Sequence, residues 1–282
     1  MIDNGLIYEL YFLFFDYFFL LILTLITSYL FYKNKFKFSL LFGVFSISVF
    51  INFFYGFQDH HSVDKKITAI TFSLRSNSEN KIQDIGKVIR DYSPDILFLQ
   101  EINKGDEFKD SIVINFPNYT FVSNDNKSTA LMTLYPVNRV EFIGNIQKVS
   151  LEIKGEDVIS YNFHAPKFFL NYMNFHRFYN SLLDDINSKE NERVIVAGDF
   201  NLIRNNTPRK KIESELNFKG ALSHFGSGSI STFPGPGHKL GFFGSFFSID
   251  EIYVKGIKIS FGSTIDFNSS SDHKPVVAYL EL

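Results

Sequence analysis

The 282-residue chain contains no cysteine. This absence excludes disulfide bridges, cysteine-ligated zinc, iron–sulfur clusters and a thiol nucleophile. It leaves the redox compartment open, because a chain without cysteine is compatible with either side of a membrane. A strong excess of charge is lacking as well. The formal net charge is −2, so no global basic field indicates a nucleic-acid coat protein.

Charge is scarcest at the N-terminus, where residues 1–57 hold three acids and three bases. The segment from Phe38 to Phe57 has no charge at all, and its twenty residues would span roughly 30 Å as a helix. The run from Tyr17 to Tyr32 reaches that length only if part of Leu10–Phe15 is added, which places Asp16 near the interface. We therefore predict two transmembrane helices, at about 10–32 and 38–57.

The link between these two segments, Lys33–Lys37, carries three lysines, which prefer the cytoplasm. A cleaved signal peptide is disfavoured, because the start is acidic, the apolar stretch is long and no small-residue cleavage site follows. The pattern predicts a multi-pass membrane protein with residues 10–57 in the lipid bilayer and the larger domain extracytoplasmic. Lys65, Lys66 and Arg75 favour the opposite orientation. No obligate protein partner is expected.

Residues 58–66 are polar and are interpreted as a linker, and residues 67–282 as one catalytic domain. Helical spacing of apolar residues predicts helices over Asn80–Tyr92 and Phe168–Asn187. Apolar runs predict strands over Lys66–Leu74, Asp95–Gln100, Tyr119–Ser123, Thr129–Leu134, Val149–Ile153, Val158–Phe163, Arg193–Ala197, Glu251–Val254 and Val276–Leu280. Many strands with few helices between them favour an α+β (mixed α/β) layered domain. The cluster Arg209–Lys211 is interpreted as a solvated basic face.

Polar side chains occur where several of these strands begin or end, which is where a sheet presents a site. Each one alone is more typical of a turn or a cap. They are Glu101, His164, Asp199, Asn201, Asp250, Asp272 and His273.

Four segments along one domain resemble the endonuclease/exonuclease/phosphatase superfamily, which includes pancreatic-type deoxyribonuclease, neutral sphingomyelinases and inositol-polyphosphate 5-phosphatases. The resemblance covers about Lys66 to Leu282. It implies a four-layer α/β/β/α sandwich with the site at the edges of the sheets. The segments are SPDILFLQE, VIVAGDFN, SIDEIYV and SSDHKPVVAYL.

The resemblance also implies a role for each residue. Glu101 corresponds to the carboxylate that binds a catalytic divalent metal, Mg²⁺ or Mn²⁺, and Asp272 matches an acidic residue close to that metal. Asp199 would orient or deprotonate the attacking water, and Asn201 would help to hold the phosphate.

Two histidines complete the implied machinery. His273 would stabilise charge on the phosphoryl group or donate a proton, and Asp250 would fix its tautomer and orientation. His164 matches a second histidine that helps the leaving group. These residue types suit an anionic phosphoester, which needs a cation, an aligned water and a charged donor.

One position departs from the pattern. The family's first strand carries T-F-N-L, and its Asn helps to hold the metal, whereas this chain has Thr71-Phe72-Ser73-Leu74. Ser73 keeps an oxygen but lacks the amide, so it is a doubtful metal ligand. Asn77 lies a few residues further on, but its spacing does not support a substitute role.

The leading hypothesis is a membrane-anchored, metal-dependent phosphoester hydrolase of the phosphodiesterase, nuclease or phosphatase type. Its substrate is nucleic acid, a phospholipid or a small phosphoester, with a lipid-linked phosphoester as the alternative to nucleic acid. The rival is a non-catalytic relative that binds a phosphoester or polymer at a degenerate site, and Ser73 favours it. The loop from Gly235 to Phe247 holds four phenylalanines, which either pack beneath the site or form an apolar rim.

Overall fold

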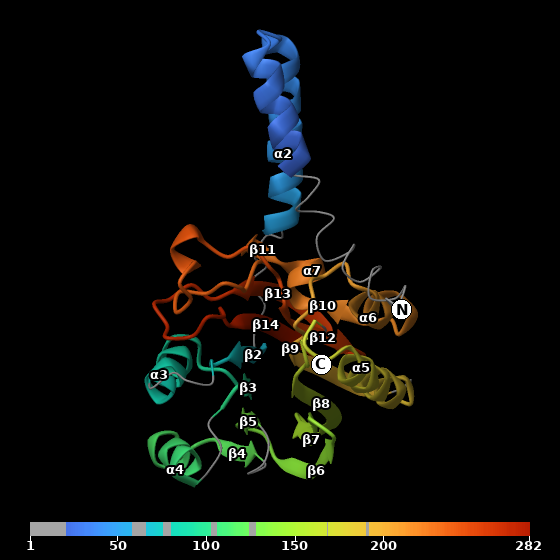
Figure 1. Ribbon diagram of the computed structural model, residues 1–282. Helices are drawn as coiled ribbons and strands as arrows, with labels where there is room; N and C mark the ends of the chain where they lie inside the picture. Colours follow the sequence, from blue (N-terminus) through green and yellow to red (C-terminus); the bar gives the residue numbers. More distant parts are fainter. Residues whose placement is uncertain are drawn as a thin grey trace.

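The computed structural model of the chain describes residues 21–57, 66–75, 80–102, 106–123, 128–167, 169–189 and 192–282; for residues 49–57 and 243 it describes the backbone only. Two six-stranded sheets form its centre. Helices α3 and α4 lie on one side of the pair of sheets, and α5 and α6 lie on the other (Figure 1). Their bounds are Lys81–Tyr92, Asp106–Asn115, Tyr172–Asn187 and Thr207–Lys210.

The first sheet has the strand order β13-β14-β2-β3-β5-β4. In sequence order these strands are β2 (Ile67–Ser73), β3 (Ile96–Gln100), β4 (Thr120–Ser123), β5 (Thr129–Thr133), β13 (Lys258–Thr264) and β14 (Val276–Glu281). Strands β2 and β3 are parallel, and α3 provides the crossover between them.

The second sheet has the order β10-β12-β9-β8-β7-β6. Its strands are β6 (Val137–Ile143), β7 (Ile146–Ile153), β8 (Glu156–His164), β9 (Arg193–Asp199), β10 (Lys219–Gly220) and β12 (Asp250–Lys255). Strands β8 and β9 are parallel, with α5 as their crossover. The shorter elements are α7 (Ala221–Phe225), the π-helical turn η1 (Lys211–Glu215), and the 3₁₀ turn η2 (Gly241–Phe243).

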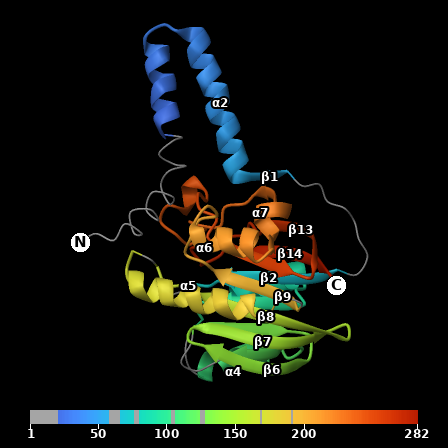
Figure 2. The ribbon, with the colours of Figure 1, turned by 90° about the vertical axis from the view of Figure 1, so that its right-hand side faces the viewer.

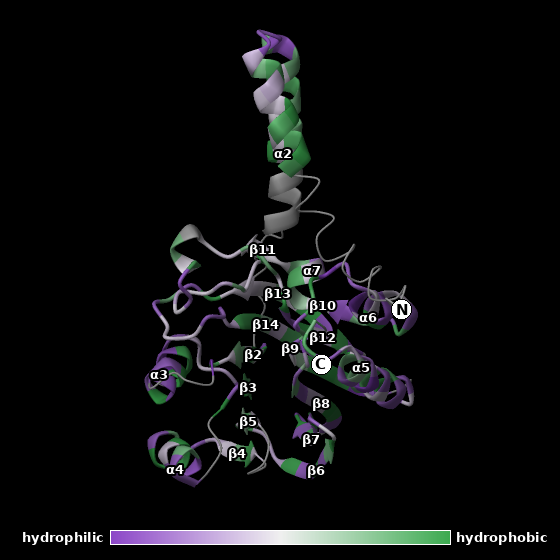
Figure 3. Ribbon diagram, viewed as in Figure 1, coloured by the Kyte–Doolittle hydropathy of each residue, from purple (hydrophilic) through white to green (hydrophobic). Residues whose placement is uncertain are grey.

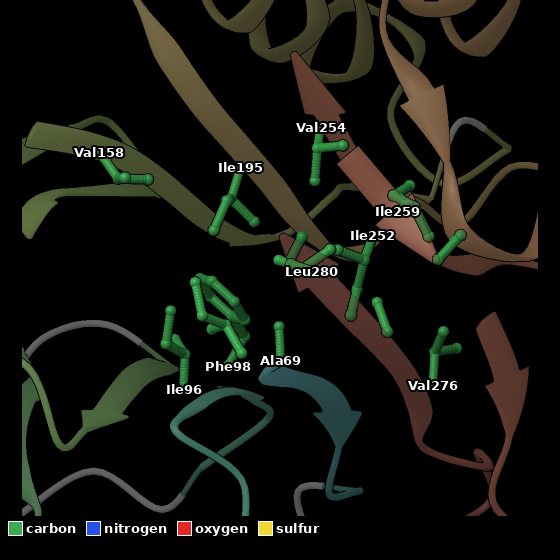
Figure 4. Packing of buried hydrophobic residues seen from close by; sticks show 14 of the residues in the cluster. Ala69, Ile96, Phe98, Val158, Ile195, Ile252, Val254, Ile259, Val276 and Leu280 are labelled. Atoms are coloured by element: carbon green, nitrogen blue, oxygen red, sulfur yellow. The ribbon is translucent and has the colours of Figure 1, made fainter. Parts of the chain in front are cut away.

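The main core lies between the two sheets. Phe98 and Ala69 of one sheet face Ile195 and Ile252 of the other, and all four are essentially inaccessible to solvent (Figure 4). Two outer cores hold the helices: α5 packs on β8 and β9, while α3 and α4 pack on β2, β3 and β5. Burying one large apolar side chain contributes about 1.5–3 kcal/mol, so these three cores supply most of the driving force.

This arrangement is the mixed α+β sandwich with two sheets that the sequence predicted. Each predicted strand and both predicted helices of the domain correspond to an observed element. The sequence reading missed β6, β10, β11 (Ser227–Ser229), β13 and the helices α4, α6 and α7.

A helical hairpin projects from one end of the sandwich. It consists of residues 21–32, which are helical, and α2 (Phe36–Phe54), and the two helices lie side by side (Figures 1 and 2). The hydroxyl of Ser39 donates to the carbonyl of Thr27 across the pair at 3.2 Å. Hydrophobic residues dominate the hairpin, whereas the turn at its tip, with its three lysines, is hydrophilic (Figure 3).

The prediction of transmembrane helices at about 10–32 and 38–57 does not gain support from the structure. Residues 10–20 lie outside the described residues, and among those that are described no helix is long and apolar enough to cross a membrane. The end of the second segment was predicted wrongly. Tyr55–Phe57 form strand β1, because their backbone groups pair with β11 (Ser227–Ser229) instead of continuing the helix. Most of the predicted linker, residues 58–65, is also outside the described part.

Candidate active site

The site lies where the ends of neighbouring strands meet. His164 ends β8 and Asp199 ends β9, and the two residues are partners in the parallel ladder. On the other side of β9, Asp199 is paired with Asp250, the first residue of β12. The sheet therefore places three of the predicted residues in one row, and Glu101 follows directly after β3 in the facing sheet.

His273 and Asp250 form a buried pair. The Nδ1 atom of His273 lies 2.9 Å from Oδ2 of Asp250, and both side chains are at least nine-tenths buried. The ring of Phe233 lies against the imidazole, with 5.2 Å between ring centroids. The hydroxyl of Thr232 accepts from the backbone N–H of Asp250 at 3.2 Å and so holds the chain at the start of β12. The structure thus brings His273 and Asp250 together, and the orienting role of Asp250 stays a prediction.

The paired carboxylates keep His273 charged. Burial alone would lower the pKa of this imidazole, but Asp250 and Asp199 outweigh burial and raise its pKa to about 10. His273 is therefore a cation at neutral pH, with Nδ1 committed to Asp250 and Nε2 turned towards Asp199 at 3.7 Å. A fixed cation next to a carboxylate suits the stabilisation of a developing negative charge.

Asp199 is the centre of the constellation. Its Oδ2 lies 3.5 Å from Nε2 of His164 and 3.7 Å from Nε2 of His273, and it receives no hydrogen bond from the described residues. Its Oδ1 accepts the backbone N–H of Asn201 at 2.8 Å. Burial raises the pKa of Asp199 to about 6; Asp250 adds to the rise, and both histidines oppose it. One oxygen is thus anchored, and the other is available to a water or a ligand.

Glu101 lies across from His164, whose Nε2 is 3.6 Å from the Glu101 carboxylate. Its backbone is left-handed, with φ of 53°, which turns the chain sharply at the end of β3. Lys81, which the sequence reading missed, is 2 % exposed and donates from Nζ to the Glu101 carbonyl at 2.7 Å. Burial lowers the pKa of Lys81 to about 8, although the Glu101 charge opposes the shift.

The donor set fits a hard divalent cation. Among the described residues, four buried oxygens of this region have no hydrogen-bond partner: Oδ2 of Asp199, Oδ1 of Asp250, Oδ1 of Asp272 and Oγ of Ser73. Orphaned buried oxygens are costly unless water or an ion satisfies them. Carboxylate and hydroxyl oxygens are the ligands that Mg²⁺ and Mn²⁺ prefer. Glu101, His164 and Asp199 also place ligand atoms within 4.8 Å of one another, as do Asp199, Asp250 and His273.

Ser73 ends β2 opposite Gln100 and is fully buried. Its carbonyl accepts the hydroxyl of Ser271 at 2.5 Å, and the same hydroxyl receives the backbone N–H of His273 at 3.0 Å. The backbone of Ser73 is therefore tied to the segment that carries His273, while its hydroxyl has no hydrogen-bond partner among the described residues. Asn77, the suggested substitute, lies outside the described residues.

Asn201 has a left-handed backbone, with φ of 49°, and its side-chain amide donates to the carbonyl of Ala165 at 2.8 Å. This bond ties the turn after β9 to the segment after His164. The predicted contact between Asn201 and phosphate stays a prediction.

Comparison with known proteins decides the family. Residues 70–273 match the model of the Endonuclease/Exonuclease/phosphatase family. The chain belongs to this family. Most of the domain is therefore covered by one match, from β2 to His273, and every predicted site residue lies within it.

Solved structures share the fold of this chain at low sequence identity. An endonuclease/exonuclease/phosphatase from Bacteroides vulgatus superposes with a TM-score of 0.66 at 16% identity, covering 78% of this chain and 100% of that one. TDP2 from D. rerio, complexed with a single-strand DNA product, gives 0.63 at 16% identity, with coverages of 78% and 100%. A mannosyl-6-phosphatase from Bacteroides thetaiotaomicron gives 0.61 at 14% identity, with coverages of 77% and 100%. No curated protein sequence matches this chain.

A polar bridge joins the two sheets of the family fold beneath the site. The side chain of Gln100 donates to Asn162 at 2.7 Å and to the hydroxyl of Thr71 at 3.0 Å. Asn162 in turn donates to Gln147 at 2.9 Å and to the carbonyl of Ala130 at 2.8 Å. All of these side chains are buried, so each polar atom in the bridge depends on the others. The sequence reading missed this bridge.

Arg209 was predicted to be part of a solvated basic face, and this prediction is wrong. Its side chain is completely buried because the guanidinium has its partners inside the protein. It donates to the carbonyls of Leu202 at 3.0 Å and Ser248 at 2.6 Å, and it pairs with buried Glu251 at 3.3 Å. Leu202 follows the Asp199 turn, and Ser248 precedes Asp250. Arg209 therefore clamps together the two loops that carry these carboxylates.

The phenylalanine loop fits neither of the two sequence interpretations completely. The side chain of Phe247 is partly buried and lies 6.4 Å from Phe233, the ring that supports His273. Phe242, by contrast, is 78% exposed on the short helix η2. The end of the loop at Phe247 thus packs near the ring that supports His273, whereas Phe242 in its middle faces outwards.

Proposed function

We propose that the protein is a divalent-metal-dependent phosphoester hydrolase in which Asp199 activates water. The observation that carries the proposal is the surroundings of Asp199. Its unpartnered Oδ2 lies 3.5–3.7 Å from two histidines, and one of these is held as a cation by Asp250. A buried carboxylate oxygen that holds no hydrogen bond from the described residues can accept a proton from a water, while the neighbouring fixed cation stabilises charge that develops on a phosphoryl group.

Each residue has one task in this mechanism. Asp199, with its pKa raised to about 6, is ionised at neutral pH and accepts a proton from the attacking water. His273 stabilises the negative charge that grows on the phosphoryl oxygens. His164, 3.6 Å from Glu101, assists the leaving oxygen from the other side of Asp199.

A bound Mg²⁺ or Mn²⁺ would neutralise the non-bridging phosphoryl oxygens. Glu101 and Asp272 are the residues that we propose to hold it, with the hydroxyl of Ser73 as a weaker contributor. The left-handed backbone of Glu101 and the hydrogen bond from Lys81 fix the direction in which this carboxylate points.

The test is the turnover of bis-p-nitrophenyl phosphate, with DNA, RNA, phospholipids and inositol phosphates as further substrates, each with Mg²⁺ and Mn²⁺. Asp199→Asn should lower turnover by at least about 10²-fold, because a positioned base contributes roughly 10²–10⁴-fold. Asp157→Asn removes an exposed carboxylate at the far end of β8 and serves as the control.

The rival function is a phosphoester-binding protein without activity, which the loss of the amide at Ser73 favours. Binding of these substrates without turnover in either metal would support the rival and overturn the hydrolase. Equal turnover by Asp199→Asn and the wild type would show that Asp199 is not the base.

We also propose that the helical hairpin attaches the protein to a lipid bilayer, with the catalytic domain outside the cytoplasm. The support is the exposure of its apolar side chains; Phe31, Phe38 and Leu41 are each at least 60% exposed. The lysines at the tip favour a cytoplasmic turn. Protein released from membranes by alkaline carbonate would contradict attachment. A reporter after Leu282 that works only in the cytoplasm would contradict the orientation.

A further inference from the structure

A cavity of about 640 Å³ opens beside His164. Four segments form most of its walls: Ser128 and Thr129 at the start of β5, the turn between β6 and β7, the stretch from His164 to Lys167, and one face of α5. The helix contributes Asn174, Arg177, Phe178 and Ser181, whose spacing places them on a single face. Helix α5 lies alongside β8 and β7 on the outer side of the second sheet (Figure 2). The volume is that of a site for a nucleotide-sized group.

The charge on the walls of this His164 cavity is of one sign. Lys167 and Arg177 line it, and none of its described lining residues is an aspartate or a glutamate. Neither cation takes part in an ion pair with a described residue, whereas Lys148 nearby on β7 is paired with Asp185 at 2.8 Å. Two such cations at the mouth of one concavity repel each other, and an anionic ligand would relieve the repulsion.

The remaining walls of the cavity are suited to an uncharged organic group. Ile146 and Phe178 are buried apolar residues that present their surface to the cavity. Apolar walls lower the local dielectric constant, which strengthens the attraction between the two cations and an anion. The cavity therefore combines a binding surface for a compact organic group with a cationic rim.

The cavity is continuous with the reacting centre, because His164 belongs to both. Nε2 of this histidine lies 3.5 Å from Oδ2 of Asp199 and 3.6 Å from Glu101. A group in the cavity would be joined directly to the phosphoester at Asp199, on the side of the leaving oxygen.

We propose that the His164 cavity is a subsite for a second phosphate, carried by the leaving alcohol of the substrate and bound by Lys167 and Arg177. This inference rests on the proposed hydrolase function and narrows its substrate class. The preferred substrate is a phosphodiester in which a short uncharged spacer joins the scissile phosphate to a terminal phosphomonoester. A nucleotide and a glycerol phosphate both offer this chemistry.

Matched substrates test the subsite. The dinucleotide TpT is compared with pTpT and TpTp, and glycerophosphoglycerol is compared with its terminal phosphomonoester. For the full chain, the terminal phosphate should raise kcat/KM by about tenfold or more in at least one pair, as charge-assisted hydrogen bonds are the strong ones. The pair that responds identifies the source of the phosphate. A ratio near one in both pairs would overturn the subsite.

In the substrate pair that responds, the double variant Lys167→Gln/Arg177→Gln should bring the ratio of kcat/KM with and without the terminal phosphate down towards one. Lys109→Gln/Arg90→Gln, which removes two exposed cations from α4 and α3, is the charge-matched control and should keep the ratio. If both double variants lose the preference equally, general electrostatics and not the cavity is responsible, and the proposal fails.

Calorimetry separates this inference from the hydrolase function. The Asp199→Asn chain should bind the responding phosphorylated probe at least about tenfold more tightly than the unphosphorylated one. Activity on bis-p-nitrophenyl phosphate without any difference in binding would leave the hydrolase standing and overturn the subsite. A clear difference in binding without turnover of any substrate by the wild type would leave the subsite standing and overturn the hydrolase.

Discussion

Replacing Arg209 by methionine tests the buried clamp beneath the site. Arg209 and Glu251 are both completely buried, and Glu251 also accepts the backbone N–H groups of Leu222 and Ser223. Arg209→Met keeps much of the side-chain volume but leaves Glu251 as a buried charge without its cation. Breaking a buried pair from one side typically costs about 3–5 kcal/mol.

That cost should be visible in the thermal stability of the protein. For a domain of this size, 1 kcal/mol lowers the Tm by about 2–4 °C, so Arg209→Met should lower it by about 6–20 °C. Removing both charges, in Arg209→Met/Glu251→Gln, should recover a large part of the loss, because no unpaired charge then remains in the core. Urea unfolding followed by circular dichroism gives the free energies of unfolding.

Arg193 provides the matched control. It pairs with Glu156 at 2.9 Å, but both side chains are more than a third exposed, so Arg193→Met should cost less than about 1 kcal/mol. If Arg209→Met destabilises the protein no more than Arg193→Met, the argument from burial is wrong. If the double variant is less stable than Arg209→Met, the unpaired charge is not the cause of the loss.

Three further variants test the site. Asp250→Asn removes one of the carboxylates that hold the pKa of His273 at about 10, so the alkaline limb of the pH–rate profile should move down by about 1–2 pH units. An unmoved limb would refute this role. Ser73→Asn should lower the Mg²⁺ concentration for half-maximal activity by about tenfold, and coincident titration curves would show that Ser73 is not a weakened ligand position. Lys81→Met frees the Glu101 carbonyl and should raise the Mg²⁺ requirement; an unchanged requirement would assign Lys81 a purely structural role.

Strands buried on both faces were predictable because their sequences are continuous apolar runs. Strands β3 and β9 are almost entirely buried and were found within one or two residues of their ends. Strand β6 was missed because it lies at a sheet edge, is half exposed and carries Arg139 and Glu141. Strand β13 was also missed. It contains Gly262, where a Cβ would lie 2.2 Å from the carbonyl of Ala221, and only tertiary structure brings that carbonyl close.

The site was predictable to the extent that its chemistry lies at strand ends. Glu101, His164, Asp199 and Asp250 could be singled out because each lies at the end of an apolar run, and the structure brings these four residues together. Residues that act through the backbone of others give no such signal. Lys81 donates to a carbonyl twenty residues away, and Arg209 donates to two carbonyls in separate loops. A basic residue is usually solvated, so its sequence neighbours cannot reveal such burial.

The polar bridge of Gln100, Asn162, Gln147 and Thr71 has a consequence for the evolution of this chain. Each side chain is the partner of another, so a change at one position strands a buried donor or acceptor, at a typical cost of about 1–3 kcal/mol. Loss of all four polar groups together avoids this cost. Selection should therefore retain or replace these positions as a group, and a descendant with a single substitution among them should carry a second nearby.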